Sequence, residues 1–225
     1  MIARRGTTVW CPLCDGRWDR FKDDWNRPAA LCWRCGSHER HRAQWLIVQQ
    51  EGLLAGPTAL LHFAPEFCLR PLLRRAARAH PGFRYLTADL DPTGVDLQLD
   101  LSRPDQRVGT FDAVLCSHVL EHVPDDAIAM AALRQMTAPG GWCLVMVPLD
   151  LEREQTYEDP SLTTPEQRLA AFGQRDHVRQ YAGDVEHRLT TAGFDVEVIR
   201  PGDALPGGTV RAAGLLTSDW VFVCR

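Results

Sequence analysis

The chain has 225 residues, of which 45% are hydrophobic and 24% are charged, and its formal net charge at pH 7 is −4. This length and balance are typical of a soluble globular protein with one substantial core and room for a small additional module. No apolar run approaches the roughly 20 residues that span a bilayer, and residues 1–6 lead into no signal-peptide stretch. We therefore exclude a membrane-spanning protein and expect a cytoplasmic one with no membrane partner.

Charge is distributed unevenly along the chain. Residues 1–50 carry nine Lys or Arg against five Asp or Glu, whereas the remainder carries 16 against 24. A basic N-terminal segment is compatible with a phosphate-bearing partner, and a small module with an arginine-rich surface is the simpler interpretation.

Four of the eight cysteines form two C-x2-C pairs separated by 17 residues: Cys11 and Cys14, then Cys32 and Cys35. Two intervening residues let a tight turn direct both sulfurs at one ion, and two such pairs complete a tetrahedron. Four thiolates suit zinc better than iron. We therefore predict a small zinc-ribbon or knuckle module over residues 1–45 with a structural Zn²⁺. Redox-active or disulfide-bonded cysteines are the alternative.

Residues 46–225 contain short apolar runs that stop at polar residues. The expected strands are 58–64, 83–88, 95–100, 111–116, 141–148, 194–199 and 219–224, and helical spacing marks 71–80 and 127–136. No helix is evident between the last two strands. This alternation predicts an α/β protein, in which ligands bind at the carboxyl ends of the strands.

Four segments at these strand ends carry a family resemblance: residues 60–66 (LLHFAPE), 85–91 (YLTADLD), 111–122 (FDAVLCSHVLEH) and 139–148 (PGGWCLVMVP). Their order resembles that of the class I S-adenosylmethionine (SAM) methyltransferases over roughly residues 58–225. The first segment and the N-terminal cysteine pairs are together similar to a bacterial subgroup of that family. The resemblance implies SAM as cofactor and a Rossmann-like seven-stranded sheet, closed by antiparallel strands at the end of the chain.

The first cofactor loop departs from the family pattern. Relatives carry an acidic residue and three glycines where this chain has residues 62–66. Glycines normally let the backbone approach the cofactor closely. Without them, Glu66 becomes the candidate for binding the methionine ammonium of SAM, and the resemblance assigns further cofactor contacts to His62, Phe63 and Ala64.

The next two strand ends supply carboxylates. Asp89 is the candidate for accepting hydrogen bonds from both ribose hydroxyls, and Asp91 is its close competitor. By the same resemblance, Asp100 and Leu101 lie near the adenine amino group. An Asp at a strand end is also commonly a cap or turn former.

Residues 118–122 read His-Val-Leu-Glu-His, and H-x-x-E-H is also an inverted zinc-peptidase signature. That signature requires a helix, whereas here the segment follows a predicted strand, and many methyltransferases have a similar Leu-Glu-His there. We therefore predict that Ser117 and His118 line the sulfonium end of the cofactor site, with His118 as a catalytic candidate. Glu121 and His122 position the turn or face the substrate.

The link over residues 149–193 is longer than a crossover between strands requires, and it is rich in Asp, His, Arg and Tyr. We predict a substrate-covering insertion, and a solvated loop is the alternative. His177 is the candidate general base, because the histidine pKa range suits proton removal near neutral pH. Asp176 and Arg179 are expected to orient it or to hold an anionic substrate.

These features predict a SAM-dependent methyltransferase that acts on an oxygen, nitrogen or sulfur of a small-molecule acceptor. One alternative is an RNA methyltransferase whose zinc module contacts RNA. The other is a zinc adaptor whose methyltransferase domain has lost activity, since the usual glycines are missing.

Overall fold

In the computed structural model, residues 5–25, 27–56, 59–103 and 108–225 are described, and they pack as two compact units. Within these ranges the first unit contains residues 1–56, 66–81 and 199–221, and the second contains 57–65, 82–198 and 222–225. Every described helix is too short or too polar to cross a bilayer.

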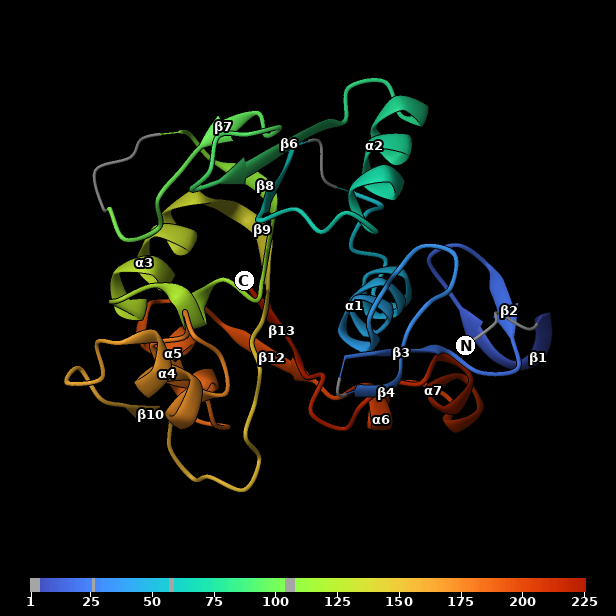
Figure 1. The fold of residues 1–225 in the computed structure, drawn as a ribbon. Coiled ribbons are helices and arrows are strands. Elements are labelled where there is room, and N and C mark those ends of the chain that lie inside the picture. Colours follow the sequence, from blue (N-terminus) through green and yellow to red (C-terminus); the bar gives the residue numbers. More distant parts are fainter. Residues whose placement is uncertain (1–4, 26, 57–58, 104–107) are drawn as a thin grey trace. The chain divides into compact units, whose positions relative to one another are not determined.

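The first unit consists of short strands and helices (Figure 1): β1 (Arg5–Cys11), β2 (Gly16–Trp18), β3 (Lys22–Asp24), β4 (Arg27–Leu31), α1 (Glu39–Gln50), α2 (Arg70–Ala79), α6 (Pro201–Ala204) and α7 (Gly207–Ala213). Two antiparallel pairs form, β1 with β2 and β3 with β4. One buried hydrophobic cluster of this unit includes Cys11, Phe21 and Cys32.

Arg42 of α1 is a buried cation that joins distant parts of this unit. Its Nη1 donates to the main-chain oxygens of Ala30 at 3.0 Å and Ser37 at 2.6 Å. Its Nε donates to the oxygen of Ala213, at the end of α7, at 2.6 Å. The hydrogen bonds fix a helix from the C-terminal part of the chain to the segment that carries the cysteines.

The second unit contains a seven-stranded sheet in the order β12-β13-β9-β8-β5-β6-β7 (Figure 1). The strands are β5 (Ala59–Phe63), β6 (Arg84–Asp89), β7 (Leu97–Gln98), β8 (Phe111–Ser117), β9 (Thr137–Met146), β12 (Val196–Ile199) and β13 (Val221–Cys224). β5 to β9 pair in parallel, and β13 runs antiparallel to β9. Asp195 and Arg225 exchange backbone hydrogen bonds of 2.8 Å, so β12 and β13 are antiparallel to each other. The Rossmann-like α/β sheet is confirmed, with β13 as its antiparallel strand.

The remaining elements of this unit are η1 (Leu120–His122), α3 (Asp126–Met136), β10 (Tyr157–Glu158), α4 (Pro165–Phe172), β11 (Arg179–Gln180) and α5 (Val185–Thr191). The predicted link over 149–193 thus contains two helices and the antiparallel pair β10 and β11. The four cysteines outside the C-x2-C pairs are buried.

Several predicted element limits differ from the structure. The third strand is only two residues long, because the Asp96 carboxylate accepts hydrogen bonds from Thr87 N and Oγ1 at 2.8 and 2.7 Å in place of a regular ladder. β9 begins at Thr137, four residues earlier than expected, and its Gly141 lies so close to β8 that a Cβ would be 2.6 Å from the oxygen of Asp112. Thr58, the predicted start of the first strand, lies outside the described residues.

The expectation of no helix between the last two strands was wrong. α6 and α7 lie there, and α7 ends at Gly214, whose φ of 59° provides a left-handed cap. The two glycines that begin α7, Gly207 and Gly208, have low helix propensity and hid this helix in the sequence.

Candidate functional site

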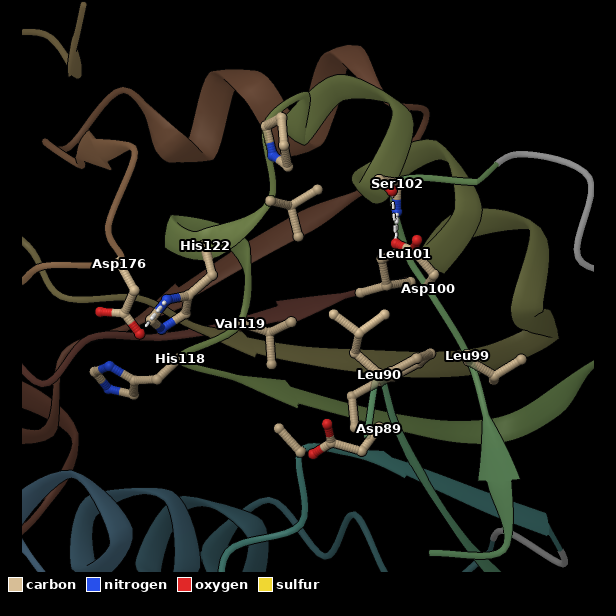
Figure 2. Close-up of a pocket in the computed structure, with 14 residues that line it drawn as sticks. Asp89, Leu90, Leu99, Asp100, Leu101, Ser102, His118, Val119, His122 and Asp176 are labelled. Carbon is tan, nitrogen blue, oxygen red and sulfur yellow. Dashed lines mark hydrogen bonds and ion pairs between the residues drawn. The ribbon is translucent and has the colours of Figure 1, made fainter. Parts of the chain in front are cut away.

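A cavity of about 560 Å³ opens at the carboxyl ends of β5, β6 and β8, within the second unit (Figure 2). Its size is in the usual range for small-molecule and cofactor pockets. Phe63 and Asp89 end β5 and β6, and His118 directly follows β8, so three parallel strands deliver side chains to one place. This is the edge of the sheet at which open α/β proteins bind ligands.

One part of the lining combines carboxylates with apolar side chains. Asp89 and Asp100 both line the cavity, together with Leu90, Leu99 and Leu101. Asp89 Oδ1 accepts a hydrogen bond of 3.0 Å from the backbone nitrogen of Asp91. The carboxylate is therefore oriented by its own loop. Such a surface can hold a flat apolar ring and a hydroxyl-bearing group together.

Asp100 is held as an anion by its neighbour. Its Oδ1 accepts hydrogen bonds from the backbone nitrogen of Ser102 at 2.9 Å and from the Ser102 hydroxyl at 2.6 Å. These two bonds lower the pKa of Asp100 below its ordinary value. Ser102 also lines the cavity, although the sequence analysis did not select it.

Two non-glycine residues in the lining have left-handed backbones. Ala64 has φ 43° and His118 has φ 55°. Their backbone nitrogens donate hydrogen bonds of 2.8 Å to the oxygens of Ala88 and Met146, each on a neighbouring strand. Left-handed backbone costs a residue with a Cβ about 1–2 kcal/mol, and such strain is concentrated at functional sites. The loop after β5 therefore makes its sharp turn without the glycines of the family pattern.

A second part of the lining is rich in histidine. Figure 2 shows His118, His122 and Asp176 together, away from Asp89 and Asp100. His118 Nδ1 lies 3.2 Å from Glu121 Oε1, and His122 Nδ1 lies 3.3 Å from Asp176 Oδ2. Each histidine is thus oriented by a carboxylate.

His177 lies behind this surface. Its ring meets the ring of His122 edge to face, with 4.8 Å between centroids, and the residue is only 3% exposed. Burial lowers the pKa of His177 below its ordinary value. The imidazole is therefore neutral at physiological pH.

Hydrogen bonds of the two residues that follow His177 hold it in this position. The backbone nitrogen of Val178 donates to the oxygen of Glu121 at 2.9 Å. The buried Arg179 donates from Nη1 to the oxygens of Leu120 and Val123 at 2.7 and 2.5 Å. The segment before β11 is thereby docked onto η1, about 55 residues earlier in the chain.

The predicted site residues divide into two groups. Those that line the cavity are Phe63, Ala64, Asp89, Asp100, Leu101, His118 and Asp176. Among the described residues, the lining does not include His62, Ser117 or His177. His62 is fully buried, with its Nδ1 2.9 Å from the Tyr85 hydroxyl, and Ser117 is buried within β8. Glu66 belongs to the first unit.

Three further candidates differ in their position relative to the cavity. Asp91 is not part of the lining among the described residues, and its carboxylate accepts a hydrogen bond from Thr93 N at 2.9 Å. Arg179, predicted to orient His177 or hold a substrate anion, is 1% exposed and donates to main-chain oxygens. His122, predicted to position the turn or to face the substrate, lines the cavity.

The four paired cysteines converge in the first unit. Cys11 Sγ lies 3.5 Å from Cys35 Sγ, and Cys14 Sγ lies 3.6 Å from Cys32 Sγ. All four sulfurs lie within 4.8 Å of one another. The Ser37 hydroxyl is 3.2 Å from Cys11 Sγ and 3.3 Å from Cys35 Sγ. This arrangement offers four sulfur ligands to one ion, and the Ser37 hydroxyl makes a polar contact with two of them.

Comparison with known proteins agrees with this geometry. A family model described as a methyltransferase domain matches residues 61–198, more than half of the chain. The ubiquinone biosynthesis O-methyltransferases of Thiobacillus denitrificans and Aromatoleum aromaticum are 53% identical to this chain over 34 and 36 residues, respectively. These matches cover 15% and 16% of this chain and 15% of each relative, so they align only a small part of either protein.

Solved structures share the fold at low identity. An O-methyltransferase family protein from Burkholderia thailandensis has a TM-score of 0.53 and 15% identity, over 83% of this chain and 59% of that chain. A SAM-dependent methyltransferase from Mesorhizobium loti has a TM-score of 0.50 and 19% identity, over 81% of this chain and 96% of that chain. At such identities the likeness shows the fold alone.

Proposed function

Since this chain belongs to the family of methyltransferase-domain proteins, we propose that it transfers a methyl group from SAM to a small-molecule acceptor. The observation that carries the proposal is the cavity at the strand ends, with the Asp89 carboxylate in its lining. The short matches to O-methyltransferases favour an acceptor hydroxyl over nitrogen or sulfur.

The residues of the cavity fit SAM. A carboxylate has two acceptor oxygens, so Asp89 can bind the two ribose hydroxyls with charge-assisted hydrogen bonds. Leu90, Leu99 and Leu101 provide apolar surface for adenine, and Asp100 provides an acceptor for its amino group. SAM supplies an electrophilic methyl group on a sulfonium.

The histidine-rich part of the lining is proposed to serve the acceptor. Methyl transfer needs the acceptor atom held in line with the methyl group, and a hydroxyl must also lose its proton. His118 faces the cavity and is oriented by Glu121, so it is positioned to accept that proton. Asp176 comes from residues 149–193 and also lines the cavity, which supports the proposal that this stretch covers the acceptor. His177 then acts through His122 as a positioning residue.

Residues 1–45 are proposed to form a zinc-binding module ahead of a catalytic domain over 46–225. Four sulfurs at about 2.3 Å from zinc would be about 3.8 Å apart, and the observed 3.5 and 3.6 Å fit that geometry. A site with four cysteines has no open position for a substrate, so the ion is structural. Its binding free energy would contribute to the folding of the module.

Two measurements test the proposed activity. Isothermal titration calorimetry with SAM should show one binding site per chain. Incubation with small hydroxylated aromatic compounds should release S-adenosylhomocysteine, whereas RNA should not increase its release. Absence of SAM binding by a correctly folded protein would refute the proposal, and release that depends on RNA and falls steeply with salt would replace the small molecule by RNA.

A further inference from the structure

We infer that Glu121, His122 and His177 form a second metal site, for a divalent transition-metal ion, at the histidine-rich end of the cavity. The binding of the ion is inferred independently of the proposed function, whereas the role of the ion rests on that function. Each of the three residues offers one ligand atom, and these atoms all lie within 4.8 Å of one another. The set comes from η1 and from the segment before β11, which the hydrogen bond from Val178 N to Glu121 O holds together.

Buried atoms without partners point to a missing cation. Glu121 is 1% exposed and His177 is 3% exposed. Glu121 Oε2 and His177 Nδ1 are both buried, and no described group forms a hydrogen bond with either atom. A buried carboxylate oxygen or ring nitrogen without a partner destabilises the folded state, and it does so more strongly if it is charged. A metal ion between these residues would satisfy both atoms at once.

The surroundings of the set match those of metal-binding residues. His122 Nδ1 lies 3.3 Å from Asp176 Oδ2, and metal-binding histidines usually have a carboxylate or carbonyl oxygen beside the ring nitrogen that does not bind the metal. This leaves Nε2 of His122 as the ligand atom. Glu121 is oriented similarly, because its Oε1 lies 3.2 Å from His118 Nδ1 while Oε2 has no such partner among the described residues.

The ligand types select the class of ion. Two imidazoles and one carboxylate suit Zn²⁺ or Fe²⁺, whereas Mg²⁺ and Ca²⁺ prefer oxygen ligands throughout. Three protein ligands leave an open position, as in catalytic zinc sites. His122 lines the cavity, so this position is accessible from the cavity.

The open position suits the oxygen of an acceptor hydroxyl. A bound ion would lower the pKa of that hydroxyl, and breaking its O–H bond would pass the proton to His118 and then to water. The oxygen lone pair forms the new O–C bond while the S–C bond of the sulfonium breaks. The products are a methyl ether, a thioether and one proton, and no oxidant or reductant is needed.

The test measures metal binding by the whole 225-residue chain. Equilibrium dialysis against Co²⁺ or Zn²⁺, followed by elemental analysis, should give one more ion per chain in the wild type than in Glu121→Gln or His177→Gln. Cobalt in the four-cysteine site gives a thiolate-to-cobalt charge-transfer band. The additional ion should add cobalt d–d absorption without increasing that band. His187→Gln, an exposed histidine on α5, is the matched control and should bind as the wild type does.

A milder variant protects the test against misfolding. The Asp176 side chain is 69% exposed, so Asp176→Asn should fold normally while weakening the second ion by about 10–100-fold. Equal metal content in wild type and His177→Gln, or unchanged affinity in Asp176→Asn, would overturn the inference. SAM calorimetry on the same samples tests the proposed function separately. If the wild type binds the second ion but does not bind SAM, the proposed function is refuted while the metal site is supported.

Discussion

Arg179 Nη1 donates a 2.7 Å hydrogen bond to the main-chain oxygen of Leu120, 59 residues earlier in the chain. The same guanidinium also binds the main-chain oxygens of Val123 and Pro124 and the Glu158 carboxylate. The turn that presents His118 and His122 is therefore shaped by a buried cation of the segment that follows β9. Site geometry and stability are linked through this one side chain.

Replacing Arg179 should reduce stability strongly. Arg179→Met leaves main-chain oxygens unpaired and removes the cation beside Glu158, so the free energy of unfolding should fall by about 3–5 kcal/mol. Urea denaturation followed by circular dichroism measures this change. Arg175→Met, at a side chain 61% exposed, should change the free energy by less than about 1 kcal/mol. Similar losses in the two variants would contradict the structural role of Arg179.

Asp89 should dominate SAM affinity. Asp89→Asn removes the charge from an acceptor in the lining, so binding should weaken by about 1–3 kcal/mol in calorimetric titrations. Asp91→Asn changes a carboxylate two residues away that is outside the described lining, and it should bind SAM as the wild type does. The reverse result would transfer the ribose contact to Asp91.

The left-handed backbone at Ala64 should respond to residue type. Ala64→Gly relieves the strain of φ 43°, so the free energy of unfolding should rise by up to about 1 kcal/mol. Ala64→Val should lower it by about 1–2 kcal/mol, since a β-branched residue is poorly accommodated there. Ala59→Gly, in the strand β5, is the matched control and should destabilise by about 0.5–1 kcal/mol. Destabilisation by both glycine variants would argue against strain at Ala64.

The cysteine cluster should bind one zinc ion per chain. Cys14→Ser or Cys35→Ser should remove it and destabilise the first unit, because a structural ion contributes directly to folding. Elemental analysis of protein purified without chelators measures the loss. Cys68→Ala changes a buried cysteine of the same unit that lies outside the cluster, and it should retain the ion. Equal zinc in all of these variants would refute the site.

His38 should make the first unit sensitive to mild acid. Burial, with help from Arg40 and Arg27, lowers the pKa of His38 to about 4 from an ordinary value of 6.5. Between these values the unfolded chain binds the proton more readily, so the stabilising contribution is complete above pH 6.5 and is lost as pH falls toward 4. At pH 5.5 the loss should be about 1 kcal/mol.

Denaturant titrations at pH 7.5 and 5.5 measure this effect. Wild type should lose about 1 kcal/mol more than His38→Gln, which has no group to protonate at that position. Equal losses in the two proteins would show that other groups cause the acid sensitivity.

The strands and their terminal carboxylates were predictable because the signal is local. Apolar runs such as 111–116 are long enough to fill a buried parallel strand, and a polar residue marks where burial ends. Asp89 and Asp100 therefore reach the cavity as expected. β7 was predicted too long, because hydrogen bonds between the Asp96 side chain and Thr87 replace those of a regular ladder. No sequence pattern predicts this replacement.

The sequence by itself determined the α/β class, the order of the strand-end motifs and the two C-x2-C motifs, since each depends on spacing within a few residues. Only the tertiary structure decided which neighbouring side chains face the cavity. His62 and Phe63 follow each other in β5, whose side chains alternate between faces, and Phe63 lines the cavity while His62 is buried. The tertiary structure also placed His177 beside His122, because the hydrogen bonds of Val178 and Arg179 join segments about 55 residues apart, and such pairings leave no periodic trace in the sequence.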